Sequence, residues 1–143
     1  LKKSNFDIFK NQFESIVKDS VGHKMFTRSF HYDLLIDFSK LTIENIKIIQ
    51  RMAPFGLGNK RPVFRTNNCF IDSKLKFLGK DQQIVKSIIK DKYETKLSFI
   101  CFDKKSDLVG LKSPFDILYN VNLNNFSGQE TVELTIRELY IKK

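Results

Sequence analysis

The sequence predicts a mainly β chain with some α, in which a small five-stranded Greek-key barrel follows a helix–strand–helix connector. From residue 63 onward, apolar and polar residues alternate with the period of strands, in five runs separated by turn residues. Before residue 63, apolar residues recur at helical spacing in two stretches that flank one short alternating run. With 41% hydrophobic residues, the 143-residue chain can form a core for one compact domain plus an appended element.

The N-terminal part is expected to contain two helices and one strand. Residues 4–19 form the first predicted helix, which carries Phe6, Phe9 and Phe13 on one face. Residues 30–36 alternate as a strand would. Thr42 is expected to cap a second helix over 43–52, which ends before Pro54 because proline lacks the backbone N–H and constrains the preceding residue.

The C-terminal part supplies the barrel. Its strand runs lie near 63–66 continuing to 69–78, then 83–90, 95–102, 115–124 and 130–141. In the last run the apolar phase shifts by one residue after Ile136, so we predict a β-bulge near Arg137–Glu138. Five short strands with a corner-turning bulge suit a barrel of OB type.

The charge distribution and the two cysteines indicate the kind of partner and the cellular compartment to expect. The net charge is +9, and residues 60–113 alone contain 13 basic and 6 acidic residues, which favours a surface that meets a phosphate backbone. Cys69 and Cys101 lie far apart in apolar runs, without metal-knuckle spacing, as expected of free thiols in a reducing cytoplasm, while a disulfide between the two stays open as an alternative. No run of about 18 apolar residues suggests a membrane span.

The stretch from Ala53 to Phe64 reads Ala-Pro-Phe-Gly-Leu-Gly-Asn-Lys-Arg-Pro-Val-Phe and combines a helix stop, a glycine-paired turn and the entry into a strand. It lacks the third glycine and the preceding strand of a phosphate-binding loop. Taken alone it predicts a stiff structural elbow formed by Pro54, Phe55, Gly56, Gly58, Asn59 and Pro62. Its amino-acid sequence closely resembles a segment of RecJ-type single-strand-specific DNA exonucleases.

This resemblance covers nearly the whole chain. Phe9–Phe13 and residues 32–37 look like the closing helix and following strand of the family's DHHA1-type domain, and Leu78-Gly79, Lys86 and the Asn124–Gly128 turn look like parts of its OB-fold. It implies a division into the tail end of the DHHA1-like domain (1–40), a connector helix with the elbow (41–62) and an OB-fold nucleic-acid-binding domain (63–143). Two positions depart from the family, where Ile84 replaces a histidine and Phe126 a tryptophan.

The resemblance implies a metal-dependent 5′–3′ exonuclease of single-stranded DNA that acts in repair and recombination in the cytoplasm. The family's aspartate and histidine motifs are missing here, since the chain has only His23 and His31 as histidines. We therefore expect no catalytic residue, metal or cofactor in this chain, and Mn²⁺ or Mg²⁺ in a catalytic domain outside it. The implied partners are single-stranded DNA, single-strand-binding protein or other recombination proteins, and no membrane, with the protein as a monomer.

Single-strand binders combine a positive groove with aromatic platforms on which bases stack. Alternate strand residues share a face, so the strand lysines can form such a groove. Phe77 and Phe99 are expected in the core instead, whereas Tyr93 lies in a polar hairpin. The predicted nucleic-acid-binding residues are Lys60, Arg61, Arg65, Lys74, Lys76, Lys86, Lys90, Tyr93, Lys96 and Phe126.

Other interpretations remain open. The lysines can be the solvated outer face of a barrel, or they can dock the acidic tail of a repair partner such as a single-strand-binding protein. An unrelated enzyme would use Asp33 and Asp37, which can share a strand face, but no third acid or base accompanies them.

Overall fold

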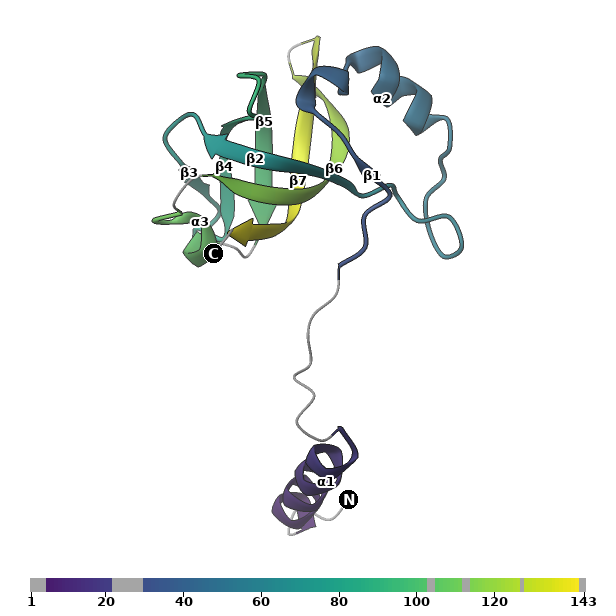
Figure 1. Cartoon of the computed structure of the whole chain (residues 1–143), viewed down its shortest axis with the longest axis vertical. Coiled ribbons are helices and arrows are strands. Elements are labelled where there is room, and N and C mark those ends of the chain that lie inside the picture. The colour runs from purple at the N-terminus through teal and green to yellow at the C-terminus, as the bar shows by residue number, and fades with distance from the viewer. Residues whose placement is uncertain (1–4, 22–29, 103–104, 112–113, 127, 142–143) are drawn as a thin grey trace. The chain divides into compact units, whose positions relative to one another are not determined.

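The computed structural model describes residues 5–21, 30–102, 105–111, 114–126 and 128–141 (Figure 1). The chain divides into two compact units, Leu1–Phe30 and His31–Lys143. Within these units the helices and strands, in chain order, are α1 (Phe6–Val21), β1 (Leu34–Leu35), η2 (Phe38–Lys40), α2 (Ile43–Gln50), β2 (Phe64–Ile71), β3 (Lys76–Leu78), β4 (Ile84–Lys90), β5 (Lys96–Phe102), α3 (Lys105–Leu108), β6 (Phe115–Phe126) and β7 (Gln129–Ile141).

The first unit contains the helix α1, close to the predicted range. Ser4, the first residue of the predicted range, and Gly22 just after α1 lie outside the described residues. Phe9 and Phe13 stack with ring centroids 5.8 Å apart, as their spacing of four residues allows. Lys18 pairs with Glu14 at 2.9 Å one turn away. Among the described residues, no helix is long and apolar enough to cross a membrane.

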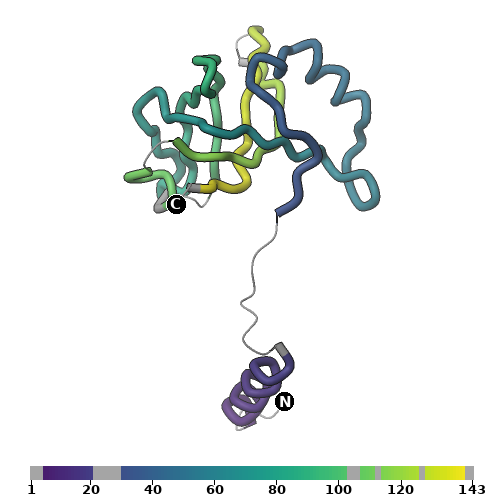
Figure 2. The backbone as a smooth tube through the Cα atoms, in the orientation of Figure 1, coloured from purple at the N-terminus to yellow at the C-terminus, as the bar shows by residue number. Residues whose placement is uncertain are grey.

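The second unit is built on a ring of five strands. The sheet order is β1-β2-β6-β7-β5-β4-β3, and an additional antiparallel pairing of β2 with β4 closes the ring, whose path Figure 2 traces. Neighbouring strands of the ring are antiparallel except β5 and β7, which are parallel. This is the predicted mainly β class and the predicted OB-type barrel, with β1 and β3 as short additions at its edges.

The strand runs read from the sequence correspond closely to the observed strands. The run expected over 69–78 divides into β2 and β3, because residues 72–75 leave the regular ladder. Both strands pair antiparallel with β4 and run in the same direction along it, with a register shift between them. The predicted bulge is confirmed, since Leu118 and Tyr119 of β6 pair with Glu138 and Ile136 of β7 and skip Arg137 in the ladder. Leu139 thereby regains the core side of the strand.

The core fills the inside of the ring. Alternate residues of β4, β5 and β7, such as Val85, Phe99 and Leu134, are fully buried there. Tyr119 lies among them, and its hydroxyl group contacts Thr66 Oγ1 at 2.7 Å, while Thr66 donates to the carbonyl of Ile36 at 2.6 Å. Burial raises the pKa of Tyr119 well above its usual value.

Helix α2 begins at the predicted cap and closes one side of the barrel. The Thr42 side chain accepts a hydrogen bond from the backbone amide of Asn45 at 3.2 Å, and Ile46 is buried in the core. Lys47 pairs with Glu130 of β7 at 2.6 Å. At another point of the barrel, Leu108 of α3 joins the core.

The segment before α2 packs with the barrel. β1, in the run that the resemblance assigned to a preceding domain, pairs in parallel with β2, with Leu34 opposite Phe64. Phe38 of η2 is buried against the Tyr119 ring, with their centroids 6.1 Å apart. The compact unit therefore begins at His31, while the assignment of residues 1–40 to a separate domain stays a prediction.

Candidate nucleic-acid interface

The outer surface of β3, β4 and β5 is the first feature of the candidate site. In an OB barrel, the second and third strands and the loops beside them contact oligonucleotides, and here those strands are β4 and β5. Inward residues of β4 are buried, so Lys86, Ile88 and Lys90 face outward. Lys86 lies opposite Lys76 of β3 and Lys90 opposite Lys96 of β5, which brings four predicted lysines onto one face.

A groove of about 830 Å³ opens beside this face, between the start of α2, strands β4 and β5, and the end of the β6–β7 hairpin. Leu97 and Val132 supply apolar lining, and Lys86, Lys96 and Ser98 supply polar groups. The groove therefore offers both cationic and apolar contacts, as a nucleic-acid strand requires.

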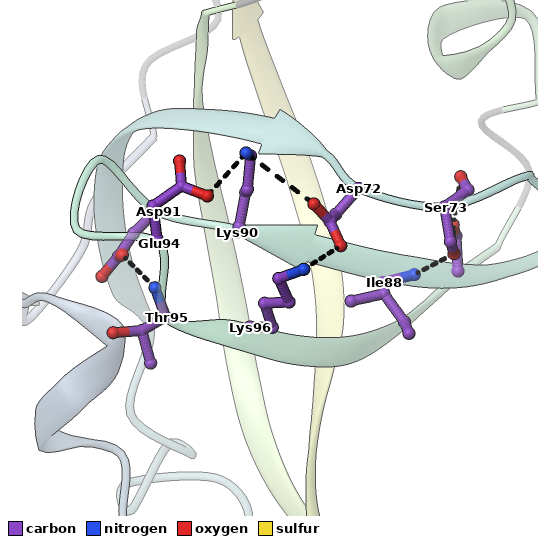
Figure 3. Close-up of polar contacts among 9 residues, drawn as sticks. Asp72, Ser73, Ile88, Lys90, Asp91, Glu94, Thr95 and Lys96 are labelled. Carbon is purple, nitrogen blue, oxygen red and sulfur yellow. Dashed lines mark hydrogen bonds and ion pairs between the residues drawn. The ribbon is translucent and has the colours of Figure 1, made fainter.

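Three of the four lysines on this face form ion pairs within the molecule. Lys96 lies 2.8 Å from Asp72, and Lys90 lies 2.7 Å from Glu94 and 3.8 Å from Asp72. Figure 3 shows the Asp72 carboxylate between the ammonium groups of Lys90 and Lys96. Lys86 pairs with Glu133 of β7 at 2.5 Å.

These contacts shift the pKa values of Asp72 and Lys90. The hydrogen bond from Lys96 lowers the pKa of Asp72, and Coulomb attraction to Lys96 and Lys90 acts in the same direction. The hydrogen bond to Glu94 raises the pKa of Lys90, with a further contribution from Asp72. Both side chains therefore remain charged over a wider pH range than usual.

Lys74 and Lys76 differ from the lysines of β4 and β5. Both are exposed, and neither forms an ion pair with any residue that the structure describes. Lys76 belongs to β3, while Lys74 lies in the irregular segment that leads to it. Their charges are therefore available to a phosphate without the loss of an internal contact.

The predicted cations outside this face lie beside β6 instead. Arg65 of β2 donates to Asp116 at 2.8 Å and to Asn67 at 2.8 Å, and its hydrogen bond to Asp116 raises the pKa of its guanidinium group. Arg61 donates to Asn122 and lies over the Phe55 ring at 5.3 Å. Lys60 precedes it as an exposed residue of the elbow.

The elbow is a closed turn held by one amide side chain. The backbones of Gly56 and Asn59 exchange hydrogen bonds of 2.9 and 3.2 Å, and Gly58 has a φ of +85° that disfavours other residues. Asn59 Nδ2 donates to the carbonyls of Met52 and Pro54 at 2.8 and 2.9 Å. The remaining predicted elbow residues take part as well, with Phe55 under Arg61 and the carbonyl of Pro62 accepting from Asn120 at 2.5 Å.

Aromatic residues at the face include one that sequence reasoning missed. Phe99 is fully buried, and Phe77 packs against the core, as expected. Tyr93 is 60% exposed at the β4–β5 hairpin, where Lys92 Nζ lies 4.6 Å from its ring centroid. Phe102 is 48% exposed on the outer face of β5, and the alternation of buried Phe99 and Cys101 along that strand indicates this orientation. The side chain of Phe126 lies outside the described residues.

The described residues do not fit a metal ion. They contain no group of three His, Cys, Asp or Glu residues able to hold one, whereas Mn²⁺ and Mg²⁺ need several converging oxygen ligands. Cys69 and Cys101 are buried and are not joined by a disulfide, and burial raises the pKa of the Cys69 thiol.

Comparisons with known proteins agree with the fold. A family model described as the RecJ OB domain matches residues 32–138. The chain is similar to the RecJ structure in complex with Mn²⁺ from Thermus thermophilus, with 17% identity, a TM-score of 0.73, and coverage of 100% of this chain and 20% of that one. The Mg²⁺ complex from the same organism gives 18% identity, a TM-score of 0.70, and coverage of 100% and 21%. No curated protein matches the sequence.

The chain spans about one fifth of the length of the solved structures it resembles, and their low identity establishes the shared fold alone.

Proposed function

Because this chain belongs to the RecJ OB domain family, we propose that it is the single-stranded-DNA-binding module of a RecJ-type exonuclease. The observation that carries the proposal is the outer face of β3, β4 and β5, where lysines, an exposed aromatic ring and an adjoining groove lie at the position that OB barrels use for oligonucleotides. The parent protein would be a 5′–3′ single-strand-specific nuclease of DNA repair and recombination, acting as a cytoplasmic monomer.

In this proposal the strand lies across β4 and β5 and along the groove. Lys74 and Lys76 contact phosphates at one side, because their charges are uncompensated among the described residues. Phe102 and Tyr93 offer exposed rings for base stacking, which does not depend on base identity. The module thus binds single strands without reading their sequence and delivers them to the nuclease.

The catalytic part of the proposal lies outside this chain. Family membership favours a parent that uses Mn²⁺ or Mg²⁺, and the residues described here supply no site for either ion. The metal would therefore be bound by another domain of the parent, while this module holds the substrate.

Fluorescence-anisotropy titration of the 143-residue chain tests the proposal. Labelled single-stranded and double-stranded oligonucleotides are compared at several salt concentrations. We expect binding of the single strand with a dissociation constant of about 1 μM to 100 μM, weakening steeply with salt, and weaker binding of the duplex. Absence of binding at low salt would overturn the proposal.

A second candidate is the docking of a repair partner such as a single-strand-binding protein. It is favoured by exposed Leu78 and Phe102 on the same face as Lys76, since an acidic peptide with apolar residues would suit such a surface. Titration of labelled acidic peptides against the same chain distinguishes the two functions, and competition by unlabelled single strand shows whether one face serves both.

A further inference from the structure

The ion pair between Lys86 and Glu133 extends across the candidate interface. Lys86 belongs to β4 and Glu133 to β7, and β5 lies between these strands in the ring. On β5, Ile100 is the partner of Lys86 and Ser98 is the partner of Glu133. The lysine side chain therefore lies over the outer surface of β5, where a bound strand would run.

The carboxylate in this pair is shielded from solvent. The Glu133 side chain is 13% exposed, whereas that of Lys86 is 37% exposed. Oε2 of Glu133 is buried, and no described residue reaches it with hydrogen-bond geometry, so the Lys86 ammonium group at 2.5 Å is the charge that neutralises it. A buried carboxylate without a counter-charge is strongly disfavoured.

We propose that Glu133 occupies the position of a backbone phosphate beside Lys86 and thereby limits the affinity of this face for single strands, an inference that rests on the proposed function. A carboxylate and a phosphate present the same kind of anionic oxygen to a lysine. While Glu133 holds Lys86, the strand gains little from that lysine.

Two physical effects oppose the exchange of Glu133 for a phosphate. Moving Lys86 to the phosphate would leave the buried carboxylate unpaired, and the incoming phosphate would be repelled by that carboxylate. Lys74 and Lys76 carry no such restraint, because the described residues give them no ion pair. The wild-type face therefore holds a strand at its β3 side and only weakly over the part of β5 beside Lys86. A bound strand can dissociate readily from that part of the face.

Four variants of the 143-residue chain test this inference by anisotropy titration with a labelled single strand: Glu133→Gln, Lys86→Gln, their combination, and Glu44→Gln. Glu44 is exposed on α2 and forms no ion pair with a described residue. Glu44→Gln therefore removes one negative charge, as Glu133→Gln does, without breaking an ion pair. Thermal unfolding of each variant confirms that the barrel is intact.

We expect Glu133→Gln to raise the affinity about fivefold, the upper range for one partly exposed ion pair. It should also steepen the slope of log K against log salt by about 0.7, since one more phosphate is then neutralised. Lys86→Gln should change wild-type affinity by less than about twofold yet abolish the gain in the Glu133→Gln background.

Each outcome decides the matter. If Glu44→Gln raises the affinity as much as Glu133→Gln, net charge is the cause and the inference fails. If the gain persists in the double variant, the carboxylate acts by repulsion without Lys86, and the inference also fails. Binding by the wild type with either result leaves the proposed function intact, whereas no binding by any variant at low salt would overturn both.

Discussion

Asp91 accepts a hydrogen bond from the backbone amide of Phe38 at 2.9 Å, across 53 residues of sequence. The same fully buried carboxylate accepts from the amides of Tyr93 and Thr95 at 3.0 Å each. One side chain thus fixes the β4–β5 hairpin, which carries exposed Tyr93, to the segment that leads into α2. The candidate interface and the connector are held together by this residue.

Replacement of Asp91 by asparagine is expected to destabilise the barrel. The side-chain oxygen of asparagine can still accept hydrogen bonds from the amides of Tyr93 and Thr95. Its NH₂ group then faces the Phe38 amide, so two hydrogen-bond donors oppose each other and neither has an acceptor. The expected loss is about 1–3 kcal/mol of unfolding free energy, measured by urea denaturation. Asp81→Asn, at an exposed position, makes the same chemical change and should be nearly neutral. Equal stability of the two variants would contradict this role of Asp91.

Lys74 and Lys76 should carry a measurable share of the phosphate contacts. The double variant Lys74→Gln/Lys76→Gln is expected to weaken single-strand binding and to flatten the slope of log K against log salt by about 1.4, at ~0.7 for each phosphate. Lys10→Gln/Lys18→Gln removes two positive charges from α1 instead. An equal effect of both double variants would show that net charge, not position, determines binding.

Phe102 is expected to act through stacking rather than charge. Phe102→Ala should weaken single-strand binding by about 1–3 kcal/mol if one base stacks on the ring, with an unchanged salt dependence. Because the ring is half exposed, the fold should tolerate its loss. Val109→Ala, at a similarly exposed apolar position, is the control for general loss of apolar surface. A flattened salt slope in Phe102→Ala would indicate a role other than stacking.

Asp72 is expected to make the stability of the folded chain depend on pH in the acid range. Its pKa is lowered in the folded protein by Lys96 and Lys90, so its ionised form stabilises the fold above the ordinary aspartate pKa of about 3.9. This stabilisation is lost as the pH falls through the lowered, folded-state pKa. Thermal unfolding of wild type and Asp72→Asn should therefore differ at about pH 5 and converge at a pH below both values. A difference that stays constant with pH would exclude the ion-pair explanation.

The sequence predicts this fold well where the signal is local. Alternation identified the five strand runs, and the phase shift after Ile136 located the bulge before any partner strand was known. The interruption between β2 and β3 was harder to see, since residues 72–75 contain neither glycine nor proline. Its Ser73 instead contacts Ser87 of β4 at 2.9 Å, a partner that only the folded chain provides.

The candidate site was less predictable because its character depends on pairs distant in sequence. Lysines at alternate positions indicated one charged face, and that face exists. No local pattern reveals that Glu133 neutralises Lys86 or that Asp72 lies between Lys90 and Lys96. Phe102 was missed for a different reason, since its residue type suggests a core position and only its phase relative to Phe99 shows otherwise.

The bulge at Arg137 also constrains the length of the last strand, not only its composition. Ile136 and Leu139 both face the core, with Arg137 and Glu138 between them. Loss of Arg137 would place Leu139 two positions after Ile136 and still on the core side, but it would remove the bend and the extra twist that a bulge gives a strand. An in-frame loss of this single codon would therefore keep the hydrophobic interior in phase and would alter the path of the strand instead, so a sequence that adopts this barrel keeps the extra residue to turn the corner.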